Sequence, residues 1–141
     1  MVPYETTNHV RDHCLCLHAQ RTARALARRF DEALRPLDLT NGQFSLLMSL
    51  NRPGPARMGS VVTLLGMDRT TLTAALKPLQ RRGLVEATVD DEDKRSRLLT
   101  LTRAGRVLLK KALPVWERVH GEIDRLVVAK DDLRTALRRL S

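Results

Sequence analysis

Hydroxyl-bearing and basic side chains recur at helical spacing between residues 69 and 82. At about 100° per residue, Leu72, Leu76 and Leu79 fall on one side of a helix, and no acidic or large apolar residue falls on the opposite side. That opposite side presents Thr70, Thr73, Ala74, Lys77 and Arg81. Such hydroxyls and cations can donate hydrogen bonds to base edges and pair with phosphates. The segment therefore predicts a contact surface for a polyanion.

Basic residues also surround the tip of a predicted β-hairpin. Leu84–Val89 and Arg97–Thr102 are rich in β-forming residues and flank the polar stretch Asp90–Ser96. Residues 69–116 contain 11 Lys and Arg against 5 acids, so they hold +6 of the formal net charge of +9. The acids of this segment are Glu86, Asp90, Asp91, Glu92 and Asp93. This concentration of positive charge favours a polyanionic partner.

Other reactive residues form no recognised catalytic or metal-binding pattern. The sequence has no Gly-rich phosphate loop, nucleophile elbow or HExxH spacing, which favours a protein that is not an enzyme. His9, His13 and Cys16 share a helix face at i, i+4 and i+7, but a fourth zinc ligand is not evident, so we expect no metal and no cofactor. Cys14 and Cys16 would project about 200° apart on one helix, which predicts no disulfide between them.

Four helices are predicted before the hairpin, over residues 9–35, 41–50, 60–65 and 69–82. Residues that start or stop helices bound them: Thr40 with Gln43 and Asp68 as N-caps, and Pro36, Gly66 and Gly83 as ends. Pro78 predicts a kink or a loosened last turn in the fourth helix. The first helix carries an apolar stripe of Cys16, Ala19, Ala23, Leu26, Phe30, Ala33 and Leu37.

A long final helix and a short tail helix are predicted after the hairpin. Thr102 is the expected N-cap of the long helix, Pro114 should interrupt or bend it, and Asp131 should start the tail helix. The apolar residues at helical spacing are Leu108, Ala112, Val115, Val119, Ile123 and Leu126, then Leu133, Leu137 and Leu140. The first and last helices together present more apolar surface than one chain can cover, which predicts a symmetric homodimer.

The three helices over residues 41–50, 60–65 and 69–82, followed at once by a basic-tipped hairpin, predict a mainly α fold with a winged helix-turn-helix. In that fold one helix enters the major groove, and the hairpin contacts the minor groove or the backbone. The 141 residues suit one domain, and no apolar run approaches the ~20 residues of a membrane helix, so we expect a soluble cytoplasmic protein without a membrane partner. A basic RNA-binding domain is an alternative, but an aromatic content of 3% leaves no platform for base stacking.

Several short motifs follow one another along the chain: Leu39-Thr40, Gln43-Phe44, Asp68–Thr73, Gly83–Val85, Asp93–Arg95 and Leu101–Gly105. Their order and spacing, over roughly residues 12–120, resemble the MarR family of bacterial transcriptional regulators. The resemblance implies a homodimeric repressor on a pseudo-palindromic DNA operator that a small-molecule effector releases. It also implies a single domain over residues 1–141, with dimerisation helices at 9–38 and 103–141 and a DNA-binding lobe at 39–102.

The resemblance assigns roles to individual residues. Arg69, Thr70, Thr73 and Lys77 match positions of the recognition helix, and Arg81 extends the same face. Asp93 and Arg95 match a wing pair in which the arginine probes the minor groove and the aspartate holds its guanidinium. Ala74 and Glu92 stand where many members have arginine, which predicts fewer charged contacts than is usual.

Two signals are candidates for releasing DNA. Cys16 matches the oxidised cysteine of the family's peroxide-sensing branch, but Phe30 and Asn41 replace the tyrosines that hold the thiolate there. The apolar stripe also predicts that Cys16 is a small core residue. The other signal is a small lipophilic anion between the dimer helices and the lobe, for which His13 and Trp116 lie on suitable helices. The sequence favours the small molecule, with an oxidant-sensing repressor as the alternative.

Overall fold

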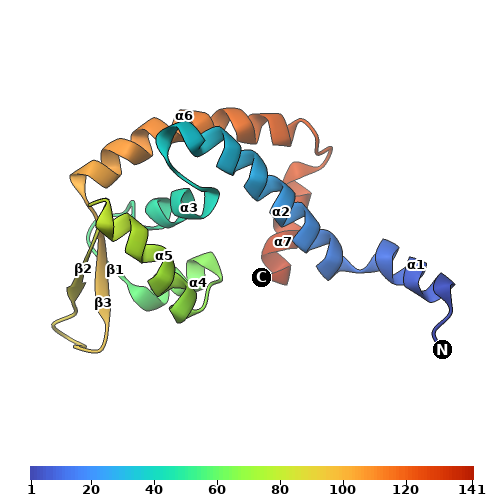
Figure 1. Cartoon of the computed structure of the whole chain (residues 1–141), viewed down its shortest axis with the longest axis horizontal. Coiled ribbons are helices and arrows are strands. Elements are labelled where there is room, and N and C mark those ends of the chain that lie inside the picture. The colour runs from blue at the N-terminus through green and yellow to red at the C-terminus, as the bar shows by residue number, and fades with distance from the viewer.

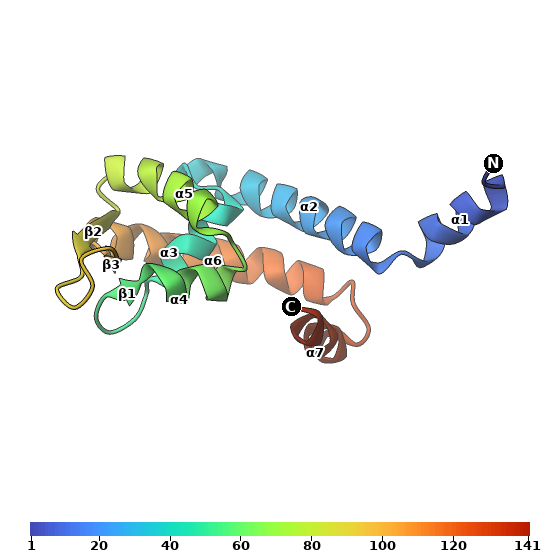
Figure 2. The same ribbon diagram turned by 90° about the horizontal axis from the view of Figure 1, so that it is seen from below.

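The computed structural model describes all 141 residues (Figure 1). Its elements are α1 (Tyr4–His13), α2 (Leu15–Leu34), the 3-10 helix η1 (Arg35–Leu37), α3 (Asn41–Ser49), β1 (Ala56–Arg57), α4 (Met58–Leu65), α5 (Arg69–Arg81), β2 (Val85–Val89), β3 (Arg97–Leu101), α6 (Arg103–Asp124) and α7 (Lys130–Leu140). Figures 1 and 2 show α3, α4, α5 and the sheet together at one end of the molecule. From this lobe, α2 and α6 extend side by side toward α1 and α7.

Polar caps fix the starts of three helices, as predicted. Thr40 forms the capping box at the start of α3. The Asp68 carboxylate accepts the Thr71 backbone N–H at 2.7 Å at the start of α5. The Thr102 hydroxyl accepts the Gly105 backbone N–H at 3.0 Å at the start of α6. Each cap satisfies an N–H group that the helix itself leaves free, so the lobe's helices begin at defined residues.

The predicted hairpin is confirmed, and it belongs to a three-stranded antiparallel sheet of order β1-β3-β2. The third strand, β1, pairs Ala56 with Leu99 and Arg57 with Leu98. It lies in a stretch for which the sequence pattern predicts no element. Two residues carry no periodicity, so this strand is defined only by its partner β3.

The hydrophobic core lies mainly in the lobe. Its fully buried large side chains are Leu34, Leu46, Leu47, Leu72, Leu79, Leu99, Leu101 and Val61. The apolar stripe of the first predicted helix is buried only at Phe30, whereas Cys16, Ala19 and Ala23 are exposed, so the prediction of Cys16 as a core residue is wrong for the single chain. Neither α1 nor α7 buries a residue.

The predicted helix over residues 9–35 is wrong in one respect, because the chain breaks it at Cys14. Cys14 has extended backbone angles (φ −72°, ψ 106°), and its Sγ accepts the Leu17 N–H at 3.4 Å as the cap of α2. Cys14 and Cys16 therefore do not share a helix, and the helical spacing that argued against a bridge does not apply to them. Both cysteines are free thiols.

Both internal prolines are accommodated within continuous helices. Pro78 lies inside α5, which stays helical to Arg81, and Pro114 lies inside α6, which the structure does not interrupt. Buried residues follow each proline, Leu79 in α5 and Val119 in α6, and their packing holds the helix beyond it. No helix is at once long and apolar enough to cross a membrane.

Candidate nucleic-acid interface

The exposed face of α5 gathers the residues predicted to contact nucleic acid. Arg69, Thr70, Thr73, Ala74 and Lys77 line one open hollow of about 310 Å³, and Arg81 is exposed one turn further along. The opposite face is anchored in the core by Leu72, Leu76 and Leu79. The ion pairs of the chain involve other residues, so the cations of this face have no carboxylate partner. They are free to meet phosphates.

Hydrogen bonds at its first turn orient this face. Asp68 accepts both the backbone N–H of Thr71 and its hydroxyl, at 2.7 and 2.8 Å. These two bonds hold the pKa of Asp68 below its ordinary value, because they favour the ionised carboxylate. The Thr73 hydroxyl donates to the Arg69 carbonyl at 2.8 Å. Its oxygen is thus left as an acceptor on the exposed surface.

The wing pair is arranged differently from what the resemblance implies. Asp93 accepts the backbone N–H of Arg95 at 3.0 Å, and no ion pair joins its carboxylate to the Arg95 guanidinium. The expectation that Asp93 holds the guanidinium is therefore wrong for this structure. Such an i to i+2 bond is a local turn interaction of aspartate, which shapes the hairpin tip and leaves Arg95 exposed.

Sequence reasoning missed Arg57, which fastens the wing to the lobe. Its guanidinium lies 2.5 Å from Glu92 and 3.5 Å from the buried carboxylate of Asp90. Asp90 is only 3% exposed, and Arg57 is its charged partner. Glu92, expected only to reduce the number of charged contacts to nucleic acid, therefore also forms an ion pair with Arg57. No local pattern could have revealed it, because 35 residues separate the two side chains.

Part of the positive charge predicted for this interface lies elsewhere. Four exposed cations of the basic segment belong to α6 and not to α5 or the wing: Arg103, Arg106, Lys110 and Lys111. Seven cations of the segment remain at α5 and the hairpin, and the hairpin also carries the acidic residues of the segment. The candidate interface therefore holds less positive charge than the count over residues 69–116 suggests.

Trp116, predicted as an effector contact, lines an apolar pocket of about 350 Å³ between α3, α4 and α6. The other apolar lining residues are Phe44, Met48, Leu64, Leu65 and Leu113. The Trp116 ring lies 6.3 Å from that of Phe44 and 4.7 Å from that of His120, measured between centroids. The pocket adjoins both the lobe and the long helix that leaves it.

The other two sensor candidates lie away from this pocket. His13 closes α1, where its Nδ1–H donates to the His9 carbonyl at 2.8 Å and its ring stacks on that of His9. Cys16 lies in the first turn of α2, and its Sγ accepts a hydrogen bond from Gln20 at 3.1 Å. The structure therefore brings Trp116, but not His13 or Cys16, to the apolar pocket.

Comparison with known proteins identifies the family. Residues 39–96 match the MarR family model. The transcriptional repressor NicR of Pseudomonas putida is 30% identical over 117 residues, which cover 83% of this chain and 71% of NicR. The Mycobacterium tuberculosis transcriptional regulator MosR, solved in complex with DNA, has a TM-score of 0.84 and is 36% identical in sequence. The match covers 91% of this chain and 93% of the MosR chain. A point mutant of Escherichia coli MarR complexed with operator DNA has a TM-score of 0.81 at 25% identity, over 93% and 96% of the two chains. The chain belongs to the MarR family of winged-helix DNA-binding transcriptional regulators.

Proposed function

We propose that this protein is a homodimeric transcriptional repressor that binds a pseudo-palindromic operator through α5 and the wing of each copy. The observation that carries the proposal is the exposed face of α5, whose cations have no carboxylate partner, next to the exposed Arg95 of the wing. Thr70, Thr73 and Lys77 enter the major groove, and Arg95 reaches the minor groove. Solved complexes of similar proteins with DNA, and the repressor NicR, support this role.

Selection of bound duplexes from a random pool tests recognition and gives the half-site spacing. An RNA pool in parallel tests the RNA-binding alternative. Lys77→Ala with Arg95→Ala should abolish specific binding, whereas Lys110→Ala with Lys111→Ala removes the same charge from α6 and should leave specificity intact. Affinity should fall by about 10³–10⁵ between 50 and 200 mM salt if ~6–10 phosphates are neutralised. Specific binding that survives the first double change contradicts the assignment.

The proposed dimer accounts for the apolar surface of the terminal helices. In one chain Leu137 of α7 is 49% exposed and Leu126, just past α6, is 68% exposed, and the start of α2 exposes Cys16, Ala19 and Ala23. A second copy related by a two-fold axis would cover these residues. Analytical ultracentrifugation should give a dimer at micromolar concentration. A folded monomer there would remove this part of the proposal.

The proposed effector is a lipophilic anion, such as an aromatic carboxylate, in the pocket beside Trp116. That pocket is largely apolar and of a volume typical for small ligands. A ligand there would act on the angle between lobe and α6, and so on the spacing of two lobes in a dimer. Because the chain has one tryptophan, its fluorescence reports directly on the pocket. A panel of aromatic carboxylates that starts with benzoate should change this emission and weaken operator binding, and Leu113→Arg should remove both effects.

An oxidant-sensing repressor is the second candidate, and the exposure of the Cys16 thiol favours it. The Gln20 amide is its one side-chain hydrogen-bond donor, and Phe30 and Asn41 supply no hydroxyl. We therefore expect an organic hydroperoxide to leave operator binding intact. Loss of binding that Cys16→Ser restores would replace the small-molecule proposal by this one.

A further inference from the structure

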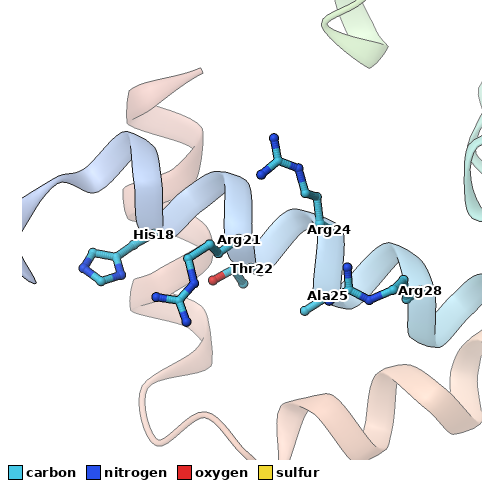
Figure 3. Close-up of a pocket in the computed structure, with 6 residues that line it drawn as sticks. All are labelled: His18, Arg21, Thr22, Arg24, Ala25 and Arg28. Carbon is cyan, nitrogen blue, oxygen red and sulfur yellow. The ribbon is translucent and has the colours of Figure 1, made fainter. Parts of the chain in front are cut away.

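Three arginines on one side of α2 have no acidic partner. Arg21, Arg24 and Arg28 line an open hollow of about 430 Å³, together with His18, Thr22 and Ala25 (Figure 3). The one side-chain hydrogen bond of these guanidinium groups goes from Arg24 to the Gln20 amide oxygen at 3.2 Å. Arginines on other helices do pair with carboxylates, among them Arg11 with Asp12 and Arg118 with Glu122. As on the exposed face of α5, the guanidinium groups of this face are thus free of carboxylate partners.

The small side chain of Ala25 creates the hollow. Arg21 and Arg28 are two helical turns apart, about 10 Å along the axis, and project from nearly the same line of the helix. Ala25 lies between them, and in Figure 3 the Arg28 side chain folds back toward it, whereas Arg24 points to the other side. His18 at one end is oriented by its Nε2–H, which donates to the Asp12 carbonyl at 3.1 Å. The hollow is thus open, with Arg21 and Arg28 along the line of Ala25 and Arg24 on the other side.

This face differs in position from both surfaces already assigned. At about 100° per residue it lies opposite the apolar stripe of Cys16, Ala19 and Ala23, so a dimer formed through the stripe leaves it accessible. Figures 1 and 2 both show this part of α2 outside the lobe that carries α5 and the wing. The face is also short, because the acidic residue Glu32 follows Arg28 by one turn.

We propose that the Arg21–Arg28 face binds a small anion with two or more phosphate groups, such as a polyphosphate or the phosphate chain of a nucleotide. The planar fork of arginine fits phosphate oxygens with two parallel hydrogen bonds, and several guanidinium groups together can hold more than one phosphate. Thr22 adds a hydroxyl donor at the edge of the hollow. This face shares no residue with the proposed operator contacts or with the effector pocket.

Calorimetric titration of the full chain with inorganic tripolyphosphate at low salt tests this site. One tripolyphosphate should bind each chain, and Arg21→Gln with Arg28→Gln should weaken it by at least about tenfold. Arg138→Gln with Arg139→Gln removes the same charge from exposed positions on α7 and should change the affinity less than about twofold. Glutamine keeps a high helix propensity, and circular dichroism checks the fold. Equal losses in both variants, or no saturable binding, would overturn the proposal.

Other ligands and variants separate the sources of the anion. Orthophosphate should bind at least about tenfold more weakly than tripolyphosphate, and equal affinity would overturn the requirement for several phosphates. Equal binding of ATP and tripolyphosphate supports recognition of phosphates alone, and tighter binding of ATP supports a nucleotide. The Lys77→Ala, Arg95→Ala variant should retain tripolyphosphate binding whether or not it binds an operator. If Arg21→Gln with Arg28→Gln weakens duplex binding as strongly as that variant, the face is a DNA contact and the proposal fails.

Discussion

The lobe and the terminal helices of this chain differ in how fully they bury their apolar residues. Leu72 and Leu79 in the lobe have no exposed surface, whereas Leu137 and Leu140 of α7 are 49% and 72% exposed. Buried apolar residues are thus concentrated in the lobe and in the parts of α2 and α6 that pack on it, whereas exposed apolar residues are concentrated toward the ends of the chain.

Truncating one leucine in each region gives the largest expected contrast. Leu79→Ala leaves a cavity in the core and should lower the free energy of unfolding by about 2–5 kcal/mol. Leu137→Ala should leave the intrinsic stability of the lobe unchanged and should instead alter how the unfolding midpoint depends on protein concentration. Urea titrations at several protein concentrations measure both quantities. Similar losses at every concentration would erase the distinction between the regions.

Two glycines of α6 allow the same comparison within one helix. A Cβ on Gly105 would lie 2.3 Å from the Leu84 carbonyl oxygen, whereas a Cβ on Gly121 would meet no atom within 4 Å. Gly105→Ala should therefore cost about 1–3 kcal/mol of stability. Gly121→Ala should be neutral or stabilising by up to about 1 kcal/mol, because alanine favours the helix. Thermal unfolding of the two variants gives the sign directly, and a destabilising Gly121→Ala would show that the terminal half is tightly packed.

The wing depends on a single cation from β1. Arg57→Gln removes the charged partner of buried Asp90 and should cost about 1 kcal/mol, since the Arg57 side chain is itself 59% exposed. Amide hydrogens of residues 90–96 should then exchange faster with solvent. Arg52→Gln removes an exposed cation without an ion pair and is the control. Unchanged exchange at the wing would mean that the backbone hydrogen bonds of the tip suffice.

The smallest expected effect is a difference in acid sensitivity between two aspartates. Hydrogen bonds from Thr71 lower the pKa of Asp68, and the Arg11 guanidinium lowers that of Asp12. A lowered pKa adds stability above the unfolded value of 3.8, and this stability is lost as the pH falls through the lower folded value. Asp68→Asn should reduce the loss of stability below pH 3.8, whereas Asp12→Asn should not, because α1 buries no residue. Unfolding titrations at neutral and acidic pH test this, and equal effects would contradict it.

Local chemistry made much of the lobe predictable. Thr40, Asp68 and Thr102 cap the helices they were expected to cap, because each interaction spans only three residues. Gly66 and Gly83 adopt the left-handed conformation that ends a helix. The exposed face of α5 also followed from helical periodicity alone. These features need no knowledge of distant residues.

The remaining features depend on long-range or backbone effects that the sequence pattern does not contain. The pairing of β1 with β3 and the contact of Arg57 with Glu92 join residues far apart in sequence. The break at Cys14 lies just before the apolar stripe begins at Cys16, and no proline or glycine marks it in the sequence. Pro114 shows the reverse case: of the interruption or bend that the local rule predicted there, the interruption does not occur, because α6 is continuous through it.

The junction between α5 and α6 has a mechanical consequence. The Thr102 hydroxyl, which caps α6, also donates to the Gly83 carbonyl at the end of α5 at 2.7 Å. From that joint α6 runs unbroken for 22 residues, about 33 Å, to Asp124. A tilt of about 5° at the far end of such a rod displaces the near end by about 3 Å. A small rotation at the terminal helices would therefore shift the wing and α5 by a distance comparable to a hydrogen-bond length, as a lever arm does.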